Sequence, residues 1–323
     1  MADMPKTVDI REEGPREGFQ IEKNIIPTGR KVEFINALAG TGLKHIQTVS
    51  FVDPRRVPNM ADAEEVVKGI VPVEGIKFTG LWLNDKGLER AIATKKLTIE
   101  GGISLSASNA FLKRNQNVSI DELIARLPTT IAKYKEHGIQ LEGGLVSAAF
   151  GCNFEGDIPV ERVVELTGTL IKLARDNGMP FKRLTLADTM GWATPASIKR
   201  VVDAVWSRYP DLDLVLHLHD TRGMGIANAY AGLEMGVRRY DAAVAGLGGC
   251  PFAGHKGAAG NVCTEDLVFM CQEMGIETNL NLDKLIECAN MAEEVVGHPL
   301  PGSVMKGGNL AKLRSAAKQA AQA

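Results

Sequence analysis

Short runs of β-branched and apolar residues alternate along the whole chain with longer segments in which apolar residues recur at helical spacing. In the segment 28–42, for example, Val32, Ile35 and Leu38 fall on one face of a helix, and glycines follow them. Alternation of this kind is typical of repeated βα units around a parallel sheet. The eight strands that it predicts begin at Val8, His45, Lys77, Gly102, Leu141, Arg183, Leu214 and Tyr240.

Eight strands in strict alternation with helices predict an α/β fold, a (β/α)8 TIM barrel. We place this catalytic domain over residues 1–300, with a short C-terminal helical extension over 301–323. A doubly wound sheet is the competing fold, but it usually has fewer strands and often a glycine-rich first turn. Here the first turn carries Pro15, Arg16 and Glu17 instead. Because barrel active sites lie at the carboxyl ends of the strands, the chemistry is expected there.

Composition narrows the functional classes. The 323 residues carry a formal net charge of -2, with charges of both signs mixed along the chain. This balance does not favour binding to nucleic acid or to a membrane surface. The five cysteines form no C-x-x-C pair, and no apolar run is long enough to cross a bilayer or to form an amino-terminal signal. We therefore expect a soluble, cytoplasmic protein with reduced thiols.

The strongest local motif is His217-Leu218-His219, at the end of the seventh predicted strand. Side chains two residues apart in a strand point the same way, so both imidazoles can reach one metal ion. Glu17, after the first strand, and Asn261, in the loop after the eighth, could supply oxygen ligands. A pair of hydrogen-bonded histidines without a metal is the alternative interpretation.

Two further residues at strand ends are candidates for catalysis. Arg16 keeps its proton at any working pH, so beside a metal it would hold developing negative charge rather than move protons. A structural ion pair with a neighbouring acid is its alternative role. Asp188 follows the sixth strand, where it could act as an acid or, alternatively, cap a helix or pair with a cation.

The segment 246–261 is rich in glycine and carries Cys250. Glycines on both sides would let this loop move, and its cysteine could then enter the site for a proton transfer. An inert buried thiol is the alternative. A phosphate cradle is not favoured, because no Gly-Lys-Ser or Gly-Lys-Thr follows the glycines.

Several blocks together resemble the hydroxymethylglutaryl-CoA lyase family, a branch of the metal-dependent lyase and synthase barrels. They are E-G-P-R-E-G-F-Q, T-V-S-F-V-D-P, F-G-C-N-F-E-G, L-A-D-T-M-G-W, H-L-H-D-T-R-G and G-L-G-G-C-P-F-A, and they occur in order over nearly the whole chain. The resemblance implies a divalent cation, Mg²⁺ or Mn²⁺, and an acyl-CoA substrate. It also implies retro-Claisen cleavage of a tertiary 3-hydroxyacyl-CoA to acetyl-CoA and a keto acid, by a homodimer.

The resemblance also assigns roles to matching positions. The metal ligands match Glu17, His217, His219 and Asn261. The catalytic positions match Arg16 as the charge stabiliser, Asp188 as the acid and Cys250 as the loop cysteine, and His217 is a second candidate to accept the hydroxyl proton. The residues expected to bind substrate are Gln20, Gln47, Ser50, His255 and Lys256.

This chain departs from the family pattern at three places. Glu17 replaces an aspartate, Gln47 replaces a glutamate, and the loop after Cys250 is two residues longer and contains His255 and Lys256. These changes suggest a substrate other than hydroxymethylglutaryl-CoA, such as citramalyl-CoA or an ester with a longer branch; drift of the scaffold is the alternative. A condensing acyl-CoA synthase and a catalytically degenerate, metal-binding member are the other candidates, although such synthases usually carry a long C-terminal region.

Overall fold

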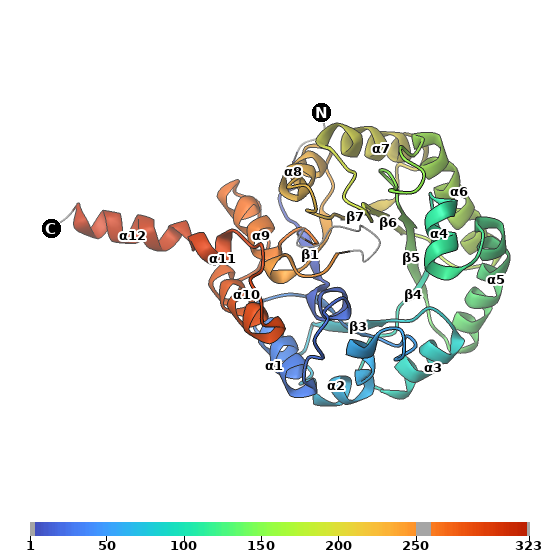
Figure 1. Ribbon diagram of the computed structural model, residues 1–323. Helices are drawn as coiled ribbons and strands as arrows, with labels where there is room; N and C mark the ends of the chain where they lie inside the picture. Colours follow the sequence, from blue (N-terminus) through green and yellow to red (C-terminus); the bar gives the residue numbers. More distant parts are fainter. Residues whose placement is uncertain (1–3, 250–259, 322–323) are drawn as a thin grey trace.

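The structure is a computed structural model that describes residues 4–249 and 260–321. Eight parallel strands form one sheet in the order β3-β2-β1-β8-β7-β6-β5-β4, and helices surround them (Figure 1). The strands are β1 (Asp9–Glu12), β2 (His45–Ser50), β3 (Lys77–Leu81), β4 (Gly101–Ser106), β5 (Leu141–Ser147), β6 (Arg183–Ala187), β7 (Asp213–His217) and β8 (Arg239–Ala242). Each starts within one residue of its predicted position, and the predicted (β/α)8 barrel is confirmed.

The helices follow the strands around the barrel. They are α1 (Thr28–Ala39), α2 (Ala63–Gly69), α3 (Asp85–Ala93), α4 (Asn109–Gln116), α5 (Ile120–Glu136), α6 (Val160–Asp176), α7 (Pro195–Arg208), α8 (Gly225–Glu234), α9 (Thr264–Glu273), α10 (Leu282–Val296), α11 (Val304–Gly307) and α12 (Leu310–Ala320). In α7 the buried residues Ile198, Val201, Val202 and Val205 recur at helical spacing, which gives the helix one apolar face for the barrel. None of the described helices is both long and apolar enough to cross a membrane.

In the part of the chain that the structure describes, the barrel has one seam without a strand ladder. Among the described residues β3 and β4 form the two ends of the hydrogen-bonded order. The side chain of Tyr134, from α5, lies at this seam: its hydroxyl donates to the carbonyl oxygen of Gly102 at 3.1 Å and accepts from Trp82 Nε1 at 3.3 Å. A side chain therefore links the two strands where the backbone ladder is absent.

The last helix projects away from the barrel (Figure 1, red). The short α11 still packs on the body, because Val304 and Met305 are buried. Arg314 on α12 forms an ion pair with Glu273, at the end of α9, at 2.5 Å. A boundary at residue 300 between barrel and extension stays a prediction.

Candidate active site

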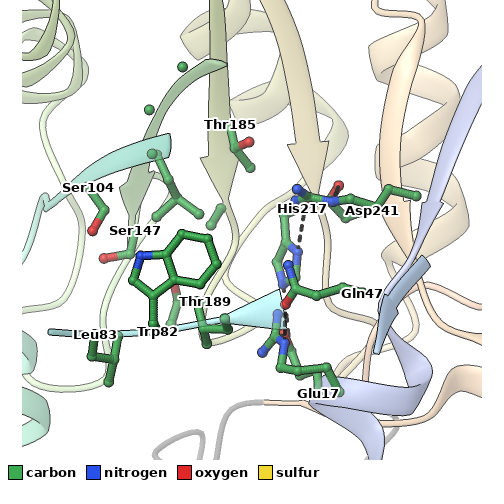
Figure 2. Close-up of a pocket in the computed structure, with 18 of the residues that line it drawn as sticks. Glu17, Gln47, Trp82, Leu83, Ser104, Ser147, Thr185, Thr189, His217 and Asp241 are labelled. Carbon is green, nitrogen blue, oxygen red and sulfur yellow. Dashed lines mark hydrogen bonds and ion pairs between the residues drawn. The ribbon is translucent and has the colours of Figure 1, made fainter. Parts of the chain in front are cut away.

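A pocket of about 490 Å³ opens inside the barrel. Its volume lies in the range typical of small-molecule sites. Figure 2 shows its walls, which come from strands on opposite sides of the barrel. One wall carries Glu17, Gln47, His217 and Asp241, and the other carries Trp82, Ser104 and Ser147. Strand ends that are far apart in the sequence therefore face one space.

The turn after β1 carries Arg16 and Glu17, the first two polar side chains that line the pocket. Residues Gly14–Gly18 form a single π-helical turn with Pro15 near its start. A Cβ atom on Gly14 would lie 2.6 Å from Glu12 Oε1, and one on Gly18 would lie 2.7 Å from Leu247 Cβ. A side chain at position 18 would therefore clash with Leu247, and one at position 14 would have to displace Glu12 Oε1 from its hydrogen bonds to the N–H groups of Gly14 and Val244.

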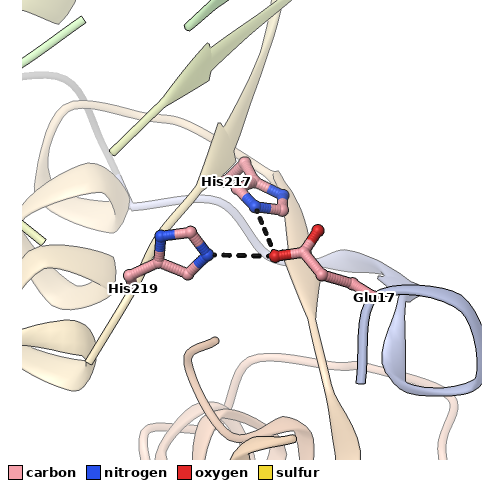
Figure 3. A group of neighbouring side chains, drawn as sticks. All are labelled: Glu17, His217 and His219. Atoms are coloured by element: carbon pink, nitrogen blue, oxygen red, sulfur yellow. Dashed lines mark hydrogen bonds and ion pairs between the residues drawn. The ribbon is translucent and has the colours of Figure 1, made fainter. Parts of the chain in front are cut away.

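Three of the predicted metal ligands meet at the pocket. Glu17 Oε1 lies 3.1 Å from His219 Nε2 and 3.7 Å from His217 Nε2 (Figure 3). One ligand atom from each residue lies within 4.8 Å of the other two. The motif at the end of β7 and the turn after β1 are thus brought together as expected.

The second nitrogen of each imidazole is occupied by the protein. His217 Nδ1 lies 3.1 Å from Asp241 Oδ2, and His219 Nδ1 lies 2.8 Å from the backbone carbonyl oxygen of Asp188. Since a carbonyl oxygen or carboxylate only accepts, each Nδ1 donates and each Nε2 faces Glu17. This is the arrangement by which proteins orient histidines toward a metal.

The electrostatics of this group favour a cation. Burial is the largest single influence on the pKa of both Glu17 and His217 and opposes their ionisation, but their charged and hydrogen-bonding neighbours together outweigh it. The positive charges of His217 and Arg16 hold the pKa of Glu17 well below its usual range, and the carboxylates of Glu17 and Asp241 raise the pKa of His217 to about 10. A divalent cation would take the place of the imidazolium proton, so binding it would release a proton.

Asn261 completes the predicted set of ligands. Its Nδ2 donates to Glu17 Oε1 at 3.2 Å and to the backbone carbonyl oxygen of Leu247 at 3.0 Å. Its Oδ1 is buried and has no hydrogen-bond partner among the described residues. Two imidazole nitrogens, a carboxylate and a free amide oxygen suit a divalent cation of intermediate hardness, so the residues fit the expected metal.

Arg16 lies beside the predicted metal ligands, and polar atoms of three side chains surround its guanidinium. Its Nη2 is 2.5 Å from Glu13 Oε2, its Nη1 is 3.1 Å from Glu17 Oε2, and its Nε donates to Gln47 Oε1. The side chain keeps 12% of its surface exposed, and it lines the pocket. The ion pair that was its alternative role is therefore present and leaves the guanidinium open to a ligand.

Asp188 is buried behind His219. Its Oδ1 accepts from the backbone N–H groups of Trp192 and Ala193, at 2.7 and 3.0 Å, whereas its Oδ2 has no hydrogen-bond partner among the described residues. Burial raises the pKa of this carboxyl group. One oxygen therefore fixes the loop before α7, and the other is unpaired.

The predicted substrate-binding residues are placed differently from one another. Gln20 lines the pocket, and its Oε1 accepts from the hydroxyl group of Ser50 at 3.1 Å. Ser50 is fully buried and reaches the pocket only through Gln20. Cys250, His255 and Lys256 lie outside the described residues, so their roles stay predictions.

Three charged residues next to the site are absent from the predicted set. Arg11 donates to both carboxylate oxygens of Asp241, at 2.9 and 2.7 Å, and its Nε lies 2.8 Å from Glu13 Oε1. The signal for Arg11 and Glu13 was their alternation in the strand V-D-I-R-E-E, which places two charged side chains on one face of a buried strand. Nothing in the local sequence connects Asp241 with them.

Known proteins share this sequence and fold. Residues 7–292 match the HMGL-like family. The chain is 39% identical over 302 residues to hydroxymethylglutaryl-CoA lyase YngG of Bacillus subtilis, covering 92% of this chain and 96% of the relative. It is 42% identical over 292 residues to the human mitochondrial hydroxymethylglutaryl-CoA lyase, covering 90% and 86%.

Solved structures agree with these matches. The crystal structure of the B. subtilis HMG-CoA lyase superposes with a TM-score of 0.87 at 37% identity, over 94% of this chain and 99% of that chain. An HMG-CoA lyase from Acinetobacter baumannii, in complex with coenzyme A and 3-methylmalate, gives a TM-score of 0.84 at 39% identity, over 96% and 97%. The chain therefore belongs to the HMGL-like family of carbon–carbon lyases.

Proposed function

We propose that this chain cleaves 3-hydroxy-3-methylglutaryl-CoA to acetyl-CoA and acetoacetate. The observation that carries the proposal is the convergence of Glu17, His217 and His219 beside the guanidinium of Arg16, in a pocket that is open to a small molecule. Relatives named for this activity cover most of the chain, and one of them holds coenzyme A.

The residues that would hold a divalent cation, Mg²⁺ or Mn²⁺, are Glu17, His217, His219 and Asn261. When bound, such a cation supplies Lewis acidity that polarises the substrate oxygens. The protein orients these ligands through Asp241 and through the backbone at Asp188.

The cleavage breaks the bond between C2 and C3 of the acyl group. Asp188 accepts the proton of the 3-hydroxyl group, whose oxygen becomes the ketone oxygen as the bonding electrons move to C2. Arg16 stabilises the negative charge of the resulting thioester enolate. Cys250 donates its proton to C2 and releases acetyl-CoA. We assign the base to Asp188 rather than to His217, since both ring nitrogens of His217 are already engaged.

Two further expectations belong to the same proposal: the protein acts as a homodimer, as the resemblance implies, and it acts in the cytoplasm, as its composition indicates. Citramalyl-CoA is the competing substrate, motivated by the neutral Gln47 beside Arg16. The relative from A. baumannii binds 3-methylmalate, a small hydroxy diacid, which supports including this ester in any test.

A panel of 3-hydroxyacyl-CoA esters tests the proposal. Purified protein with Mg²⁺ or Mn²⁺ is incubated with each ester, and the products are identified by mass spectrometry. We expect acetyl-CoA and acetoacetate from hydroxymethylglutaryl-CoA, and a strong loss of rate in Cys250→Ala but not in the control Cys288→Ala. Preference for citramalyl-CoA, with pyruvate as product, would replace the substrate; no cleavage of any ester would reject the lyase proposal.

A further inference from the structure

Six charged side chains form a closed ring that includes two of the candidate metal ligands, Glu17 and His217. Its order is Arg16, Glu13, Arg11, Asp241, His217 and Glu17, and Glu17 returns to Arg16. The successive N–O distances are 2.5, 2.8, 2.7, 3.1, 3.7 and 3.1 Å. The ring therefore joins the guanidinium assigned to the enolate with the histidine assigned to the metal.

Glu13 occupies a special place in this ring. It is completely buried and does not line the pocket, whereas its two neighbours in the ring, Arg11 and Arg16, do. Its backbone N–H donates to the carbonyl oxygen of Ala242, which fixes it between β1 and β8. Its Oε1 lies near Arg11 Nε, but that N–H is directed at Asp241, so Oε1 has no hydrogen-bond partner among the described residues. The side-chain hydrogen bond that Glu13 does make is the one that its Oε2 accepts from Arg16 Nη2.

The other neighbours of Arg16 explain why this contact matters. Gln47 accepts a hydrogen bond from Arg16 Nε but carries no charge. Glu17 is the second carboxylate in contact with Arg16, through Oε2, while its Oε1 faces the two histidines. Without Glu13, the charge of Arg16 would be balanced by Glu17 alone, and Glu17 would be drawn away from the histidines.

We propose that Glu13 is a positioning residue that neutralises Arg16 and thereby leaves Glu17 free to bind the metal. The arrangement also specifies where a replacement charge would work. Gln47 Oε1 already touches Arg16, so a glutamate at position 47 would place a carboxylate against the same guanidinium. A carboxylate at position 47, on the second strand, should therefore replace the charge of Glu13 beside Arg16.

The test compares wild type, Glu13→Gln, Gln47→Glu and the double variant Glu13→Gln/Gln47→Glu. Mn²⁺ affinity is measured by electron paramagnetic resonance without substrate, and kcat and KM are measured with hydroxymethylglutaryl-CoA. We expect Glu13→Gln to weaken Mn²⁺ binding by about tenfold or more, the range found for other outer contacts of metal ligands, and to lower kcat more than it raises KM. The double variant recovers most of both losses.

Rescue is the result that a merely structural role for Glu13 would not produce. Unchanged Mn²⁺ affinity and kcat in Glu13→Gln would overturn the proposal, and so would a folded double variant no better than Glu13→Gln. If Glu13→Gln alone does not fold, Glu13→Asp provides the comparison, because it keeps the charge and shortens the reach to Arg16. The same partial losses, again recovered by Gln47→Glu, are expected for it, and wild-type values would contradict the proposal.

The activity arm rests on the proposed function, whereas the Mn²⁺ arm does not. A wild type that cleaves no ester but binds Mn²⁺ would reject the function and still test Glu13. Asp213→Asn is the matched control. Asp213 is the first residue of β7, at the opposite end of the strand from His217, and its carboxylate pairs with Arg239. Its loss should change neither the Mn²⁺ affinity nor the kinetic constants.

Discussion

His217 Nδ1 lies 3.1 Å from Asp241 Oδ2, on the opposite side of the imidazole from Glu17. Asp241 itself is held by two hydrogen bonds from Arg11. The orientation of a metal-facing histidine therefore depends on an ion pair between the half-buried Arg11 and the buried Asp241. This dependence makes the outer contacts of the site testable separately from its ligands.

Replacing Asp241 with asparagine should weaken metal binding. The amide cannot balance the charge of Arg11 and holds His217 less firmly, so we expect Mn²⁺ affinity to fall by about 10- to 100-fold. Isothermal titration of wild type and Asp241→Asn checks this, with Asp213→Asn as control. Equal affinities in all three proteins would show that Asp241 does not orient the ligand.

Replacing Glu17 with glutamine should abolish metal binding and should lower the raised pKa of His217. Because the carboxylate of Glu17 is a main reason that the pKa of His217 lies near 10, the metal-free variant should show a lower pKa for this imidazole. Proton NMR titration of the histidine signals measures the shift, and a Mn²⁺ titration of the same samples measures binding. An unchanged His217 titration would contradict the observed contact.

Replacing Glu12 with glutamine should reduce the pH dependence of stability. Burial raises the pKa of Glu12 from 4.5 to about 8, so the folded protein holds this proton more tightly than the unfolded chain does. The resulting stabilisation is complete below pH 4.5 and is lost as the pH rises through about 8, by a few kcal/mol at about 1.4 kcal/mol per pKa unit.

The glutamine variant can keep the contacts of the protonated acid. In the structure Glu12 Oε1 accepts from the N–H groups of Gly14 and Val244, and Glu12 Oε2 accepts from the Thr264 hydroxyl. The amide oxygen of the variant would accept from the same two N–H groups, and its NH2 group would donate to the Thr264 hydroxyl, which would turn to accept. Urea unfolding of wild type and Glu12→Gln from pH 5 to pH 9 measures the difference. Parallel curves for the two proteins would exclude Glu12 as the titrating group.

Replacing Tyr134 with phenylalanine should loosen the seam between β3 and β4. The change leaves Trp82 Nε1 and the carbonyl oxygen of Gly102 without this partner, so we expect a loss of about 1–3 kcal/mol in the free energy of unfolding. The exposed Tyr230 provides the control, since Tyr230→Phe should change stability by less than about 0.5 kcal/mol. Equal effects in the two variants would mean that the hydroxyl of Tyr134 does not stabilise the seam.

The barrel could be predicted because its signals are local. Each predicted strand is a short run bounded by turn residues, and each helix has its own periodic face, so the start of every strand was predicted to within one residue. The unpaired seam could not be predicted, since β3 and β4 both read as ordinary strands. What distinguishes them is a contact of Tyr134 with two residues that lie 32 and 52 positions away.

The site could be predicted in part for the same reason. The two histidines share one short motif, and the barrel rule places Glu17 at the same rim although it is 202 positions from His219. The ring that supports them depends on an ion pair between Arg11 and Asp241, which are 230 positions apart. Neither residue carries a motif, so only the folded structure shows that they meet.

The metal dependence of cleavage tests the central claim most directly. Acetyl-CoA formation from hydroxymethylglutaryl-CoA is measured in wild type after chelation of divalent cations, and again as Mg²⁺ or Mn²⁺ is added back. We expect no activity in the chelated protein, saturable recovery with added cation, and no recovery in Glu17→Gln. Full activity after chelation, or a normal response in Glu17→Gln, would contradict the assignment of Glu17, His217 and His219 as the metal centre of a lyase.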